Sequence, residues 1–228
     1  RSLHPAIHMN AAVIVAAGKG SRMGPNVDKL FLEVAGRPVV AHTWERFEHA
    51  SSIGEIVIVV RDGMQQAFAD LAAECGFKKP CRFVVGGKER QDSVWNGLEA
   101  LSGGVEVVAI QDGARPCTSA EMIEATITAA VETGAAVAAV PVTDTIKESH
   151  DGRFAERTLN RSKLWAVQTP QTFRVEVIRR ALSEVRRQRA LVTDDTAACE
   201  FIRHPVRLVS GAAPNPKVTV PADLAYVE

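Results

Sequence analysis

The chain consists of short apolar runs separated by longer amphipathic segments. A continuous apolar run of about four to eight residues is typical of a strand buried on both faces. The segments between these runs have the length and spacing of helices, and glycine or proline marks many of their ends. The predicted strands are residues 12–17, 55–60, 81–85, 106–110, 135–140, 206–209 and 217–220, with a short extended piece at 31–34. The predicted helices are residues 38–49, 64–75, a helix from the 86–93 block to 101, one capped by Thr118 or Ser119 that ends at 132, 175–189, and a short one after 193–195.

Strands that alternate with helices predict an α/β fold: a mostly parallel, twisted sheet with right-handed crossovers and helices on both faces. The length of 228 residues suits one such domain with an excursion better than two domains. We expect residues 9–228 to form this single domain. Residues 1–8 have no targeting pattern, and we expect disordered leader or vector-derived residues there, before a native start at Met9.

The regular pattern is interrupted at residues 141–164. Polar and apolar residues alternate there around His150-Asp151-Gly152, which is a hairpin signal. A two-stranded hairpin is marginally stable alone. We therefore expect this segment to lie on a surface, either within its own domain or on a second subunit. Thr145 and Arg161 lie on its two legs, where the residues alone favour solvated positions.

The first predicted strand ends in a glycine-rich basic loop. Gly18 and Gly20 close the strand, and Lys19, Arg22 and Lys29 follow among small residues. Ligands of open α/β sheets bind at the carboxyl ends of strands, and exposed backbone N–H groups there bind anions. The loop therefore predicts a polyphosphate site; the alternative is a glycine turn with solvated basic residues.

Two common phosphate motifs do not match this loop. A dinucleotide fingerprint needs a third glycine three residues after Gly20, but Gly24 comes one residue too late. A Walker A loop ends in Gly-Lys-Ser/Thr, whereas Gly24 is followed by Pro25 and Asn26. The spacing therefore disfavours an NAD-dependent oxidoreductase and a P-loop NTPase.

A second glycine block opens a predicted helix at residues 86–93. The backbone near Gly87 and Lys88 could hydrogen-bond a base edge, and Ser93 could supply a hydroxyl. The alternative is a plain turn in which Glu89 and Asp92 complement the helix dipole.

The fourth long apolar strand is followed by Asp112 and Arg115. An acid and a guanidinium at a strand's carboxyl end could contact a polyol hydroxyl and its phosphate, respectively. The alternative is a surface ion pair that fixes a turn. Lys217, at the end of a proline-containing loop, is well placed to point inward, although by itself it would more simply be a surface lysine.

The overall composition limits which classes of binding partner we expect for the chain. With 27 basic and 27 acidic residues, the chain offers no electrostatic case for nucleic acid or an anionic membrane. No apolar run approaches the roughly 20 residues that a bilayer requires. The 4 cysteines form no CxxC pair and no zinc spacing, so we expect reduced, buried thiols in a cytoplasmic protein.

Several blocks together resemble one family in the order that the family has them. They are AAGKGSRM (16–23) with Lys29, GGKERQDSV (86–94), QDGARP (111–116), PVTDTIK (141–147), LNRSKLWAVQTPQ (159–171), TDD (193–195) and NPKVT (215–219). In this ordered set the chain is similar to the 2-C-methyl-D-erythritol 4-phosphate cytidylyltransferases of non-mevalonate isoprenoid biosynthesis. The resemblance implies a Rossmann-like domain with a protruding β-hairpin arm at 141–164 and a homodimer formed through the arms.

The resemblance also implies the reaction and the residues that carry it. CTP and a polyol phosphate would react with Mg²⁺, which the CTP phosphates would mainly hold, because no carboxylate pair flanks the basic loop; no residue is assigned as a metal ligand. The implied catalytic cations are Arg22, Lys29 and Lys217. The implied nucleotide-binding residues are Ala16, Ala17, Gly18, Lys19, Gly20, Gly87, Lys88, Ser93 and Asp112. The implied acceptor-binding residues are Asp112, Arg115, Thr169, Thr193 and Lys217, with Thr145 and Arg161 from the partner's arm.

The chain departs from the family's usual pattern in three blocks. Asp28 precedes Lys29 and adds a nearby negative charge, Lys88 stands where an acid is common, and Gln111-Asp112-Gly113 replaces His-Asp-Ala. Two other functions stay open. One is a cytidylyltransferase for another polyol phosphate, such as ribitol 5-phosphate; the other is a nucleotide-binding module without turnover.

Overall fold

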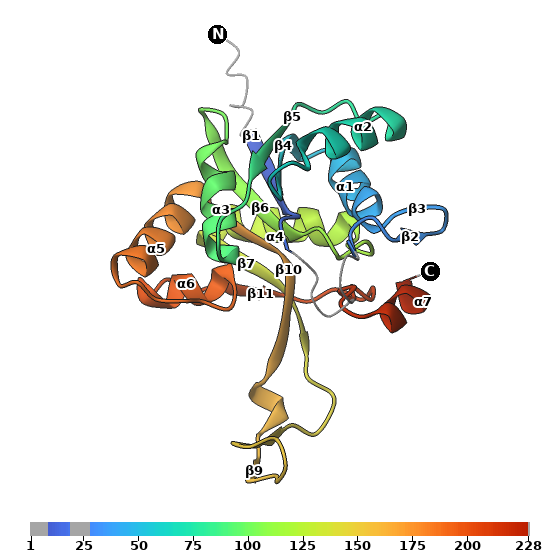
Figure 1. Ribbon diagram of the computed structural model, residues 1–228. Helices are drawn as coiled ribbons and strands as arrows, with labels where there is room; N and C mark the ends of the chain where they lie inside the picture. The colour runs from blue at the N-terminus through green and yellow to red at the C-terminus, as the bar shows by residue number, and fades with distance from the viewer. Residues whose placement is uncertain (1–8, 19–27, 228) are drawn as a thin grey trace.

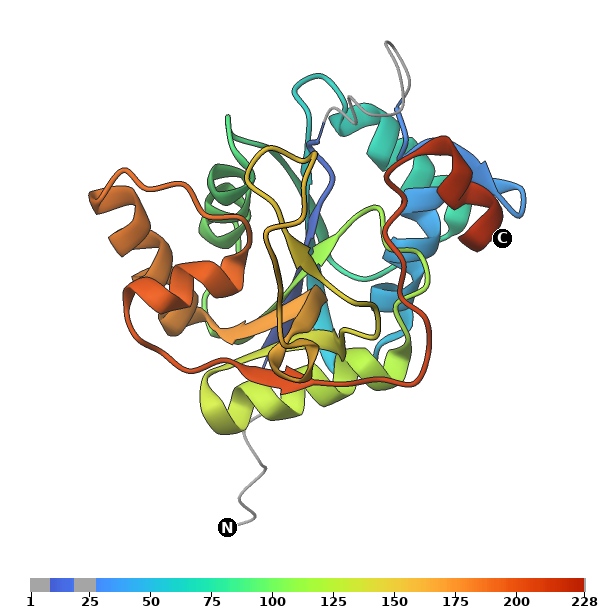
Figure 2. The ribbon, with the colours of Figure 1, turned by 90° about the horizontal axis from the view of Figure 1, so that it is seen from below.

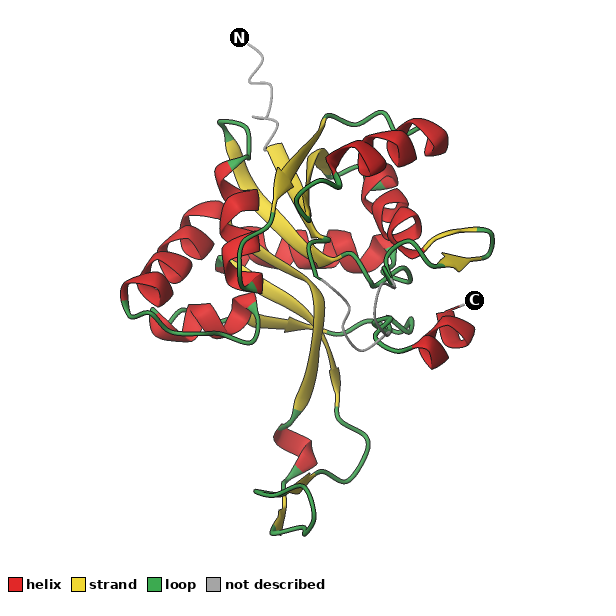
Figure 3. Cartoon of the chain, viewed as in Figure 1, coloured by secondary structure: helices red, strands yellow, loops and turns green. Residues whose placement is uncertain are grey.

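The protein folds around one seven-stranded sheet (Figures 1 and 3). The computed structural model describes residues 9–18 and 28–227. The strand order is β11-β7-β10-β6-β1-β4-β5. The strands are β1 (Met9–Val15), β4 (Ile53–Val60), β5 (Cys81–Val85), β6 (Val105–Asp112), β7 (Ala135–Pro141), β10 (Trp165–Arg174) and β11 (Arg207–Val209). The expected mostly parallel α/β sheet is confirmed.

The predicted apolar runs form the centre of this sheet. β1 lies between β4 and β6 and is parallel to both, with Val13 opposite Val57 on one side and Ile110 on the other. All three side chains are fully buried. Strands covered on both faces need apolar side chains on both, which explains why these runs are continuous rather than alternating.

The sequence pattern did not reveal the strand β10. It is antiparallel to both neighbours, β6 and β7. Its first three residues are exposed, and its buried part includes Thr169, Gln171 and Thr172. A strand whose buried residues are mostly polar shows no apolar run, so hydropathy alone could not predict it.

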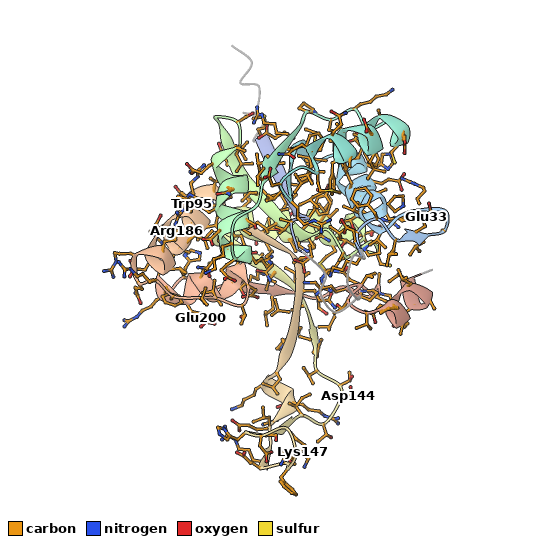
Figure 4. All side chains as sticks on the ribbon, viewed as in Figure 1. Glu33, Trp95, Asp144, Lys147, Arg186 and Glu200 are labelled. Carbon is orange, nitrogen blue, oxygen red and sulfur yellow. The ribbon has the colours of Figure 1, made fainter. Side chains whose placement is uncertain are left out.

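Helices cover both faces of the sheet, as predicted (Figure 2). The face with α1 (Val39–His49), α2 (Gln65–Cys75) and α4 (Ala120–Thr133) buries large side chains such as Trp44, Phe68 and Ile123. The other face carries α3 (Arg90–Glu99), α5 (Val175–Arg187) and α6 (Asp195–Phe201), with Leu98 and Ile178 in its core. The guanidinium of Arg186 on α5 lies 4.5 Å from the ring centroid of Trp95 on α3, so the helices also contact one another (Figure 4).

Two predicted strands are corrected by the structure. Residues 31–32 form a bend, and residues 33–34 form the two-residue strand β2 (Glu33–Val34), which pairs with β3 (Arg37–Pro38), so the expected extended piece shrinks to two residues. Residues 217–220 are not a strand. The backbone N–H groups of Thr219 and Val220 donate to the Asp223 carboxylate instead, which starts the turn η3 (Pro221–Asp223) before α7 (Leu224–Val227). The Asp223 side chain therefore accepts the backbone N–H groups that would otherwise pair with a neighbouring strand.

Residues 141–164 leave the body of the fold as an extended arm (Figure 1). Its two antiparallel strands, β8 (Lys147–Glu148) and β9 (Arg157–Thr158), are followed by the turn η2 (Arg161–Lys163). Most of the arm is exposed, and Phe154 at its tip is 76% exposed. The predicted hairpin is confirmed; its use in a dimer stays a prediction, and residues 1–8 lie outside the described residues.

Two further expectations concern the cysteines and the membrane. All 4 cysteines are free thiols, but Cys199 is the fully buried one, whereas Cys75, Cys81 and Cys117 are half-buried. Burial raises the pKa of the Cys199 thiol to about 12. In the part of the chain that the structure describes, no helix has the length and apolarity to cross a membrane.

Candidate active site

Two adjoining cavities lie at the carboxyl ends of the parallel strands. The glycine-loop cavity, about 430 Å³, is lined by Val15, Ala17, Gly18, Lys29, Leu30, Gly87, Lys88, Glu89, Arg90, Ser93, Asp112, Gly113, Ala114 and Lys217. The β10 cavity, about 170 Å³, is lined by Arg90, Asp112, Arg115, Val167, Gln168, Thr169, Gln171, Thr193, Asp194 and Lys217. Arg90, Asp112 and Lys217 border both cavities, so they form a shared wall.

The glycine-loop cavity presents backbone rather than side chains on one side. A Cβ at Gly86 would lie 2.4 Å from Ala17 Cβ, and one at Gly87 would lie 2.3 Å from Asp92 Cβ. Side chains are therefore excluded at both positions. Ser93 is buried, and its hydroxyl accepts from Gly87 N at 3.1 Å and donates to Glu89 O at 3.2 Å. Ser93 thus holds the shape of the loop.

Asp112, the last residue of β6, lies at the centre of the shared wall. Its carboxylate oxygens lie 2.7 Å from Lys217 Nζ and 3.5 Å from an Arg90 nitrogen. The Arg115 Nε lies 3.7 Å away. Burial by itself raises the pKa of the Asp112 carboxyl, but the surrounding positive charges outweigh it and lower that pKa to about 2. Asp112 is therefore ionised at neutral pH.

A buried asparagine anchors the segment that delivers Lys217. Asn215 donates from Nδ2 to Thr169 O at 2.7 Å and accepts from the Thr118 hydroxyl at 3.1 Å. Its own carbonyl oxygen accepts from Arg115 at 2.6 Å. Because these bonds tie the segment to β10 and to the end of β6, Lys217 reaches the wall although no strand carries it.

Lys29 is attached to the same C-terminal segment. It lines the glycine-loop cavity, and its Nζ donates to Val218 O at 3.0 Å. Its neighbour Asp28 forms an ion pair with Arg61. The negative charge that the sequence places beside Lys29 is therefore compensated.

Three predicted residues of the basic loop belong to a segment that the structure does not describe. Lys19, Gly20 and Arg22 lie outside the described residues. Ala16 is buried and donates its N–H to Val59 O at 2.7 Å, and it does not line the cavity, whereas Ala17 and Gly18 do.

The β10 cavity brings together Arg115, Thr169 and Thr193, as the sequence predicts for one binding site. Asp112 N donates to the Thr169 hydroxyl at 3.1 Å. Thr193 precedes α6, and Asp194 caps that helix by accepting from Ala197 N at 2.8 Å. Three segments far apart in the sequence thus meet at this cavity.

Thr145 and Arg161 do not join either cavity of the same chain. Both are exposed on the arm, and the Arg161 guanidinium donates to Thr143 O. Figure 4 shows Asp144 and Lys147, close to Thr145 in sequence, well away from the body. Their predicted contact with an acceptor would require another chain.

Sequence reasoning missed Arg90, the first residue of α3. Its guanidinium lies 2.8 Å from a carboxylate oxygen of Asp195 and 3.5 Å from one of Asp112. One signal was present: a positive side chain in the first turn of a helix opposes the helix dipole. Such a residue needs negative partners elsewhere, which Asp112 and Asp195 supply.

A bound metal would find no preformed protein cage among the described side chains. They contain no group of three or more His, Cys, Asp or Glu residues that could hold a metal ion. Three acids line the two cavities, Glu89, Asp112 and Asp194, and Asp112 and Asp194 are already engaged by cations and hydrogen bonds. This arrangement fits a divalent ion whose ligands come mainly from a bound polyphosphate.

Comparisons with known proteins agree with one another. The sequence model of the 2-C-methyl-D-erythritol 4-phosphate cytidylyltransferase family matches residues 10–228. Curated relatives with that name include one from Pelotomaculum thermopropionicum, 44% identical over 96% of this chain and 92% of its own length. Another, from Alkaliphilus oremlandii, is 42% identical over 97% of this chain and 94% of its own.

Solved structures show the same relationship. The 4-diphosphocytidyl-2C-methyl-D-erythritol synthase of Anaerococcus prevotii superposes with a TM-score of 0.85 at 31% identity, covering 96% of this chain and 94% of its own. The Thermus thermophilus cytidylyltransferase has a TM-score of 0.75 at 30% identity, with coverages of 94% and 95%. The chain therefore belongs to the 2-C-methyl-D-erythritol 4-phosphate cytidylyltransferase family, whose generally metal-dependent members carry out CTP-dependent cytidylyl transfer in non-mevalonate isoprenoid biosynthesis.

Proposed function

We propose that the glycine-loop cavity binds CTP, that the β10 cavity binds 2-C-methyl-D-erythritol 4-phosphate, and that the cytidylyl group is transferred across their shared wall. The observation that carries this assignment is that Arg90, Asp112 and Lys217 border both cavities. A nucleotide and an acceptor in adjoining cavities would have their phosphates next to each other, as the reaction requires.

The chemistry is an in-line displacement. An acceptor phosphate oxygen attacks the α-phosphorus of CTP, the new P–O bond forms, and the bond to the β-phosphate oxygen breaks, so pyrophosphate leaves with that electron pair. No general base is required, because a phosphate monoester is already anionic near neutral pH. The obstacle is repulsion between two anions. Lys29 and Lys217 would offset it, with Arg22 from the part of the basic loop outside the described residues.

Nucleotide recognition would come largely from backbone. Ala17, Gly18, Gly87 and Lys88 line the cavity where no bulky side chain intervenes. Ser93 would act by fixing the loop, because its hydroxyl already bridges Gly87 and Glu89. Backbone groups held in this way can form hydrogen bonds with the edge of a base.

Acceptor recognition would come from Asp112, Arg115, Thr169 and Thr193. Arg115 would contact the phosphate, since a guanidinium forms bidentate bonds with phosphate oxygens. The ionised Asp112 carboxylate would accept from a polyol hydroxyl.

The metal ion of the family would be Mg²⁺, held mainly by CTP phosphates, and would supply further charge neutralisation.

The arm would complete the acceptor site of a second copy. Thr145 and Arg161 are exposed and lie outside both cavities of their own chain. A symmetric dimer in which each arm reaches the partner's β10 cavity would give them an acceptor to contact.

The 4 free thiols support a cytoplasmic location.

The assignment of the acceptor is tested by pyrophosphate release. With CTP and Mg²⁺, we expect rapid release with methylerythritol phosphate and little with ribitol 5-phosphate. Arg115→Gln should raise the acceptor KM and leave the CTP KM nearly unchanged. Turnover of ribitol phosphate alone would reject the acceptor, and no turnover with either would support a nucleotide-binding module instead.

The shared site is tested by mixing two variants, each of which should have little activity at subsaturating acceptor concentration. Arg115→Gln is defective in the body, and Arg161→Ala is defective in the arm. After unfolding and refolding together, heterodimers contain one intact site, so a symmetric dimer predicts recovery of about a quarter of wild-type turnover. If the mixture stays as inactive as its components, the arm does not act in trans.

A further inference from the structure

Arg90 lies where three separate elements meet. It is the first residue of α3, directly after the glycine block, whereas Asp112 ends β6 and Asp195 begins α6. One terminal nitrogen of its guanidinium contacts Asp195 Oδ2 at 2.8 Å, and the other lies 3.5 Å from Asp112 Oδ1. The guanidinium therefore joins the helix at the glycine-loop cavity to two elements of the β10 cavity.

We infer that Arg90 is a positioning residue that holds the Asp112 carboxylate and the start of α6 in the geometry required for acceptor binding. The inference rests on the proposed assignment of the β10 cavity as the acceptor site. Arg90 needs no contact with substrate for this role, because both terminal nitrogens of its side chain already have carboxylate partners.

Asp195 and its neighbours connect the start of α6 to β10 at the wall that the two cavities share. Asp195 is 1% exposed, and its N–H donates to Gln171 Oε1 on β10 at 3.0 Å. Asp194 accepts from Gln171 Nε2 at 3.0 Å while it caps α6. Thr193, just before this cap, lines the β10 cavity. A shift of the Arg90–Asp195 pair would therefore move the start of α6 and the cavity wall together.

Charge also requires an arginine at this position. Two carboxylates, Asp112 and Asp195, face the same guanidinium, and among the cations near Asp112 the charge of Arg90 lowers the carboxyl pKa most. Asp194 adds a third negative charge nearby, whereas Lys217 and Arg115 add positive charge on the other side of Asp112. A planar fork can contact both carboxylates at once, which a single ammonium does poorly.

A purely structural alternative makes a different prediction. Asp195 Oδ1 is buried without a hydrogen-bond partner among the described residues. Arg90 could therefore serve merely as the counter-ion of a buried acid, with no consequence for the acceptor beyond stability. The two roles separate when the buried acid is removed together with the arginine.

The test compares Arg90→Gln, Arg90→Lys, Asp195→Asn and the double variant Arg90→Gln/Asp195→Asn. We expect Arg90→Gln to raise the acceptor KM about tenfold or more while the CTP KM changes less than about threefold. Arg90→Lys should fall between Arg90→Gln and the wild type. The double variant should regain thermal stability, because no unpaired buried charge remains, but its acceptor KM should stay high, because Asp112 is still not held.

Arg82→Gln is the matched control. Arg82 pairs with the buried Glu55 and donates to Ala100 O at 2.6 Å, near the amino ends of β5 and β4 and so at the other end of the strands from the cavities. The Arg82→Gln substitution should lower the thermal stability of the protein without changing the ratio of acceptor KM to CTP KM.

Three outcomes would overturn the inference. If the double variant has a normal acceptor KM, Arg90 is only the counter-ion of Asp195. If Arg90→Gln changes both KM values equally, Arg90 does not act on the acceptor side. If Arg115→Gln raises the acceptor KM while Arg90→Gln does not, only this inference fails; if neither variant moves it, the proposed acceptor site fails as well.

Discussion

The cavity wall and the arm contain similar ionic contacts in opposite environments. In the wall, the side chains of Lys217 and Asp112 are 37% and 11% exposed, and further cations surround the same carboxylate. In the arm, Arg157 pairs with Glu148, with 70% and 45% of the side chains exposed. Water screens the second pair far more than the first.

The difference shows which region can position a substrate by itself. The wall is cross-linked by buried hydrogen bonds through Asn215, Thr169 and Gln171, so its charges have defined places. The arm has two strands of two residues each, and its exposed side chains have few neighbours. The arm residues Thr145 and Arg161 could contribute to a site only against another surface, which the proposed dimer would provide.

The largest effect should come from Lys217 of the wall, and Lys147 of the arm provides the comparison. Lys217→Ala removes an ammonium that borders both cavities, and losing such a cation costs about 3 kcal/mol of transition-state stabilisation, roughly a hundredfold in kcat/KM. Lys147→Ala removes an exposed arm lysine that bonds the Thr158 hydroxyl at 2.6 Å, and should leave kcat/KM within about twofold. Steady-state kinetics of both variants checks this; comparable losses would contradict the distinction between wall and arm.

Asp112→Asn should change how stability depends on pH. The pKa of Asp112 is lowered from 3.8 to about 2, so its ionised form stabilises the fold fully above about pH 4, and this contribution is lost as the pH falls from about 4 through 2. The shift corresponds to about 2 kcal/mol. We expect urea unfolding to show that loss at pH 7 and almost none at pH 2. An equal difference at both pH values would refute an electrostatic origin.

Asn215→Asp should have an intermediate effect on stability. The substitution replaces the donor to Thr169 O with a carboxylate oxygen, which leaves a buried carbonyl unpaired at a cost of about 1–3 kcal/mol. Asn160→Asp is the control, because Asn160 caps η2 by accepting from Ser162 N at 3.1 Å and aspartate can accept equally well. Thermal melts of both variants should differ, with a lower Tm for Asn215→Asp; equal Tm values would mean that Asn215 does not anchor the segment.

The smallest effect should come from the arm ion pair. Arg157→Ala removes a contact between two largely exposed groups, and such pairs contribute under about 1 kcal/mol. The free energy of unfolding in urea should therefore stay close to that of the wild type. A loss as large as that of Asp112→Asn would show that the arm is packed against something in solution.

Much of the fold could be predicted because its central strands are apolar on both faces. β1, β4 and β6 follow from continuous runs, α1 follows from its length, and α4 follows from its length and its Ser119 cap. β10 could not be predicted in this way, because the buried residues Thr169, Gln171 and Thr172 satisfy their polar groups through partners far away in the sequence. A hydropathy pattern contains no such information.

The same distinction applies to the candidate site, because some of its residues could be predicted from the local sequence and others could not. Glycine spacing and the acid at a strand end pointed to Gly87, Asp112 and Arg115, and the structure brings them to the two cavities. Lys217 was expected at the site at the start of a strand. It borders both cavities, but residues 217–220 are not a strand, and hydrogen bonds through Asn215 position it instead. Arg90 was missed because its partners lie 22 and 105 residues away.

By itself, the sequence determined the central parallel strands, the glycine loops at their carboxyl ends and the residue types available for phosphate chemistry, because these depend on local polarity and backbone freedom. Only the tertiary structure decided which charges share a wall, since ion pairs such as Arg90 with Asp195 depend on distances between elements that the chain order does not specify. It also decided that Thr145 and Arg161 stay outside their own chain's cavities, because the arm that carries them extends away from the body.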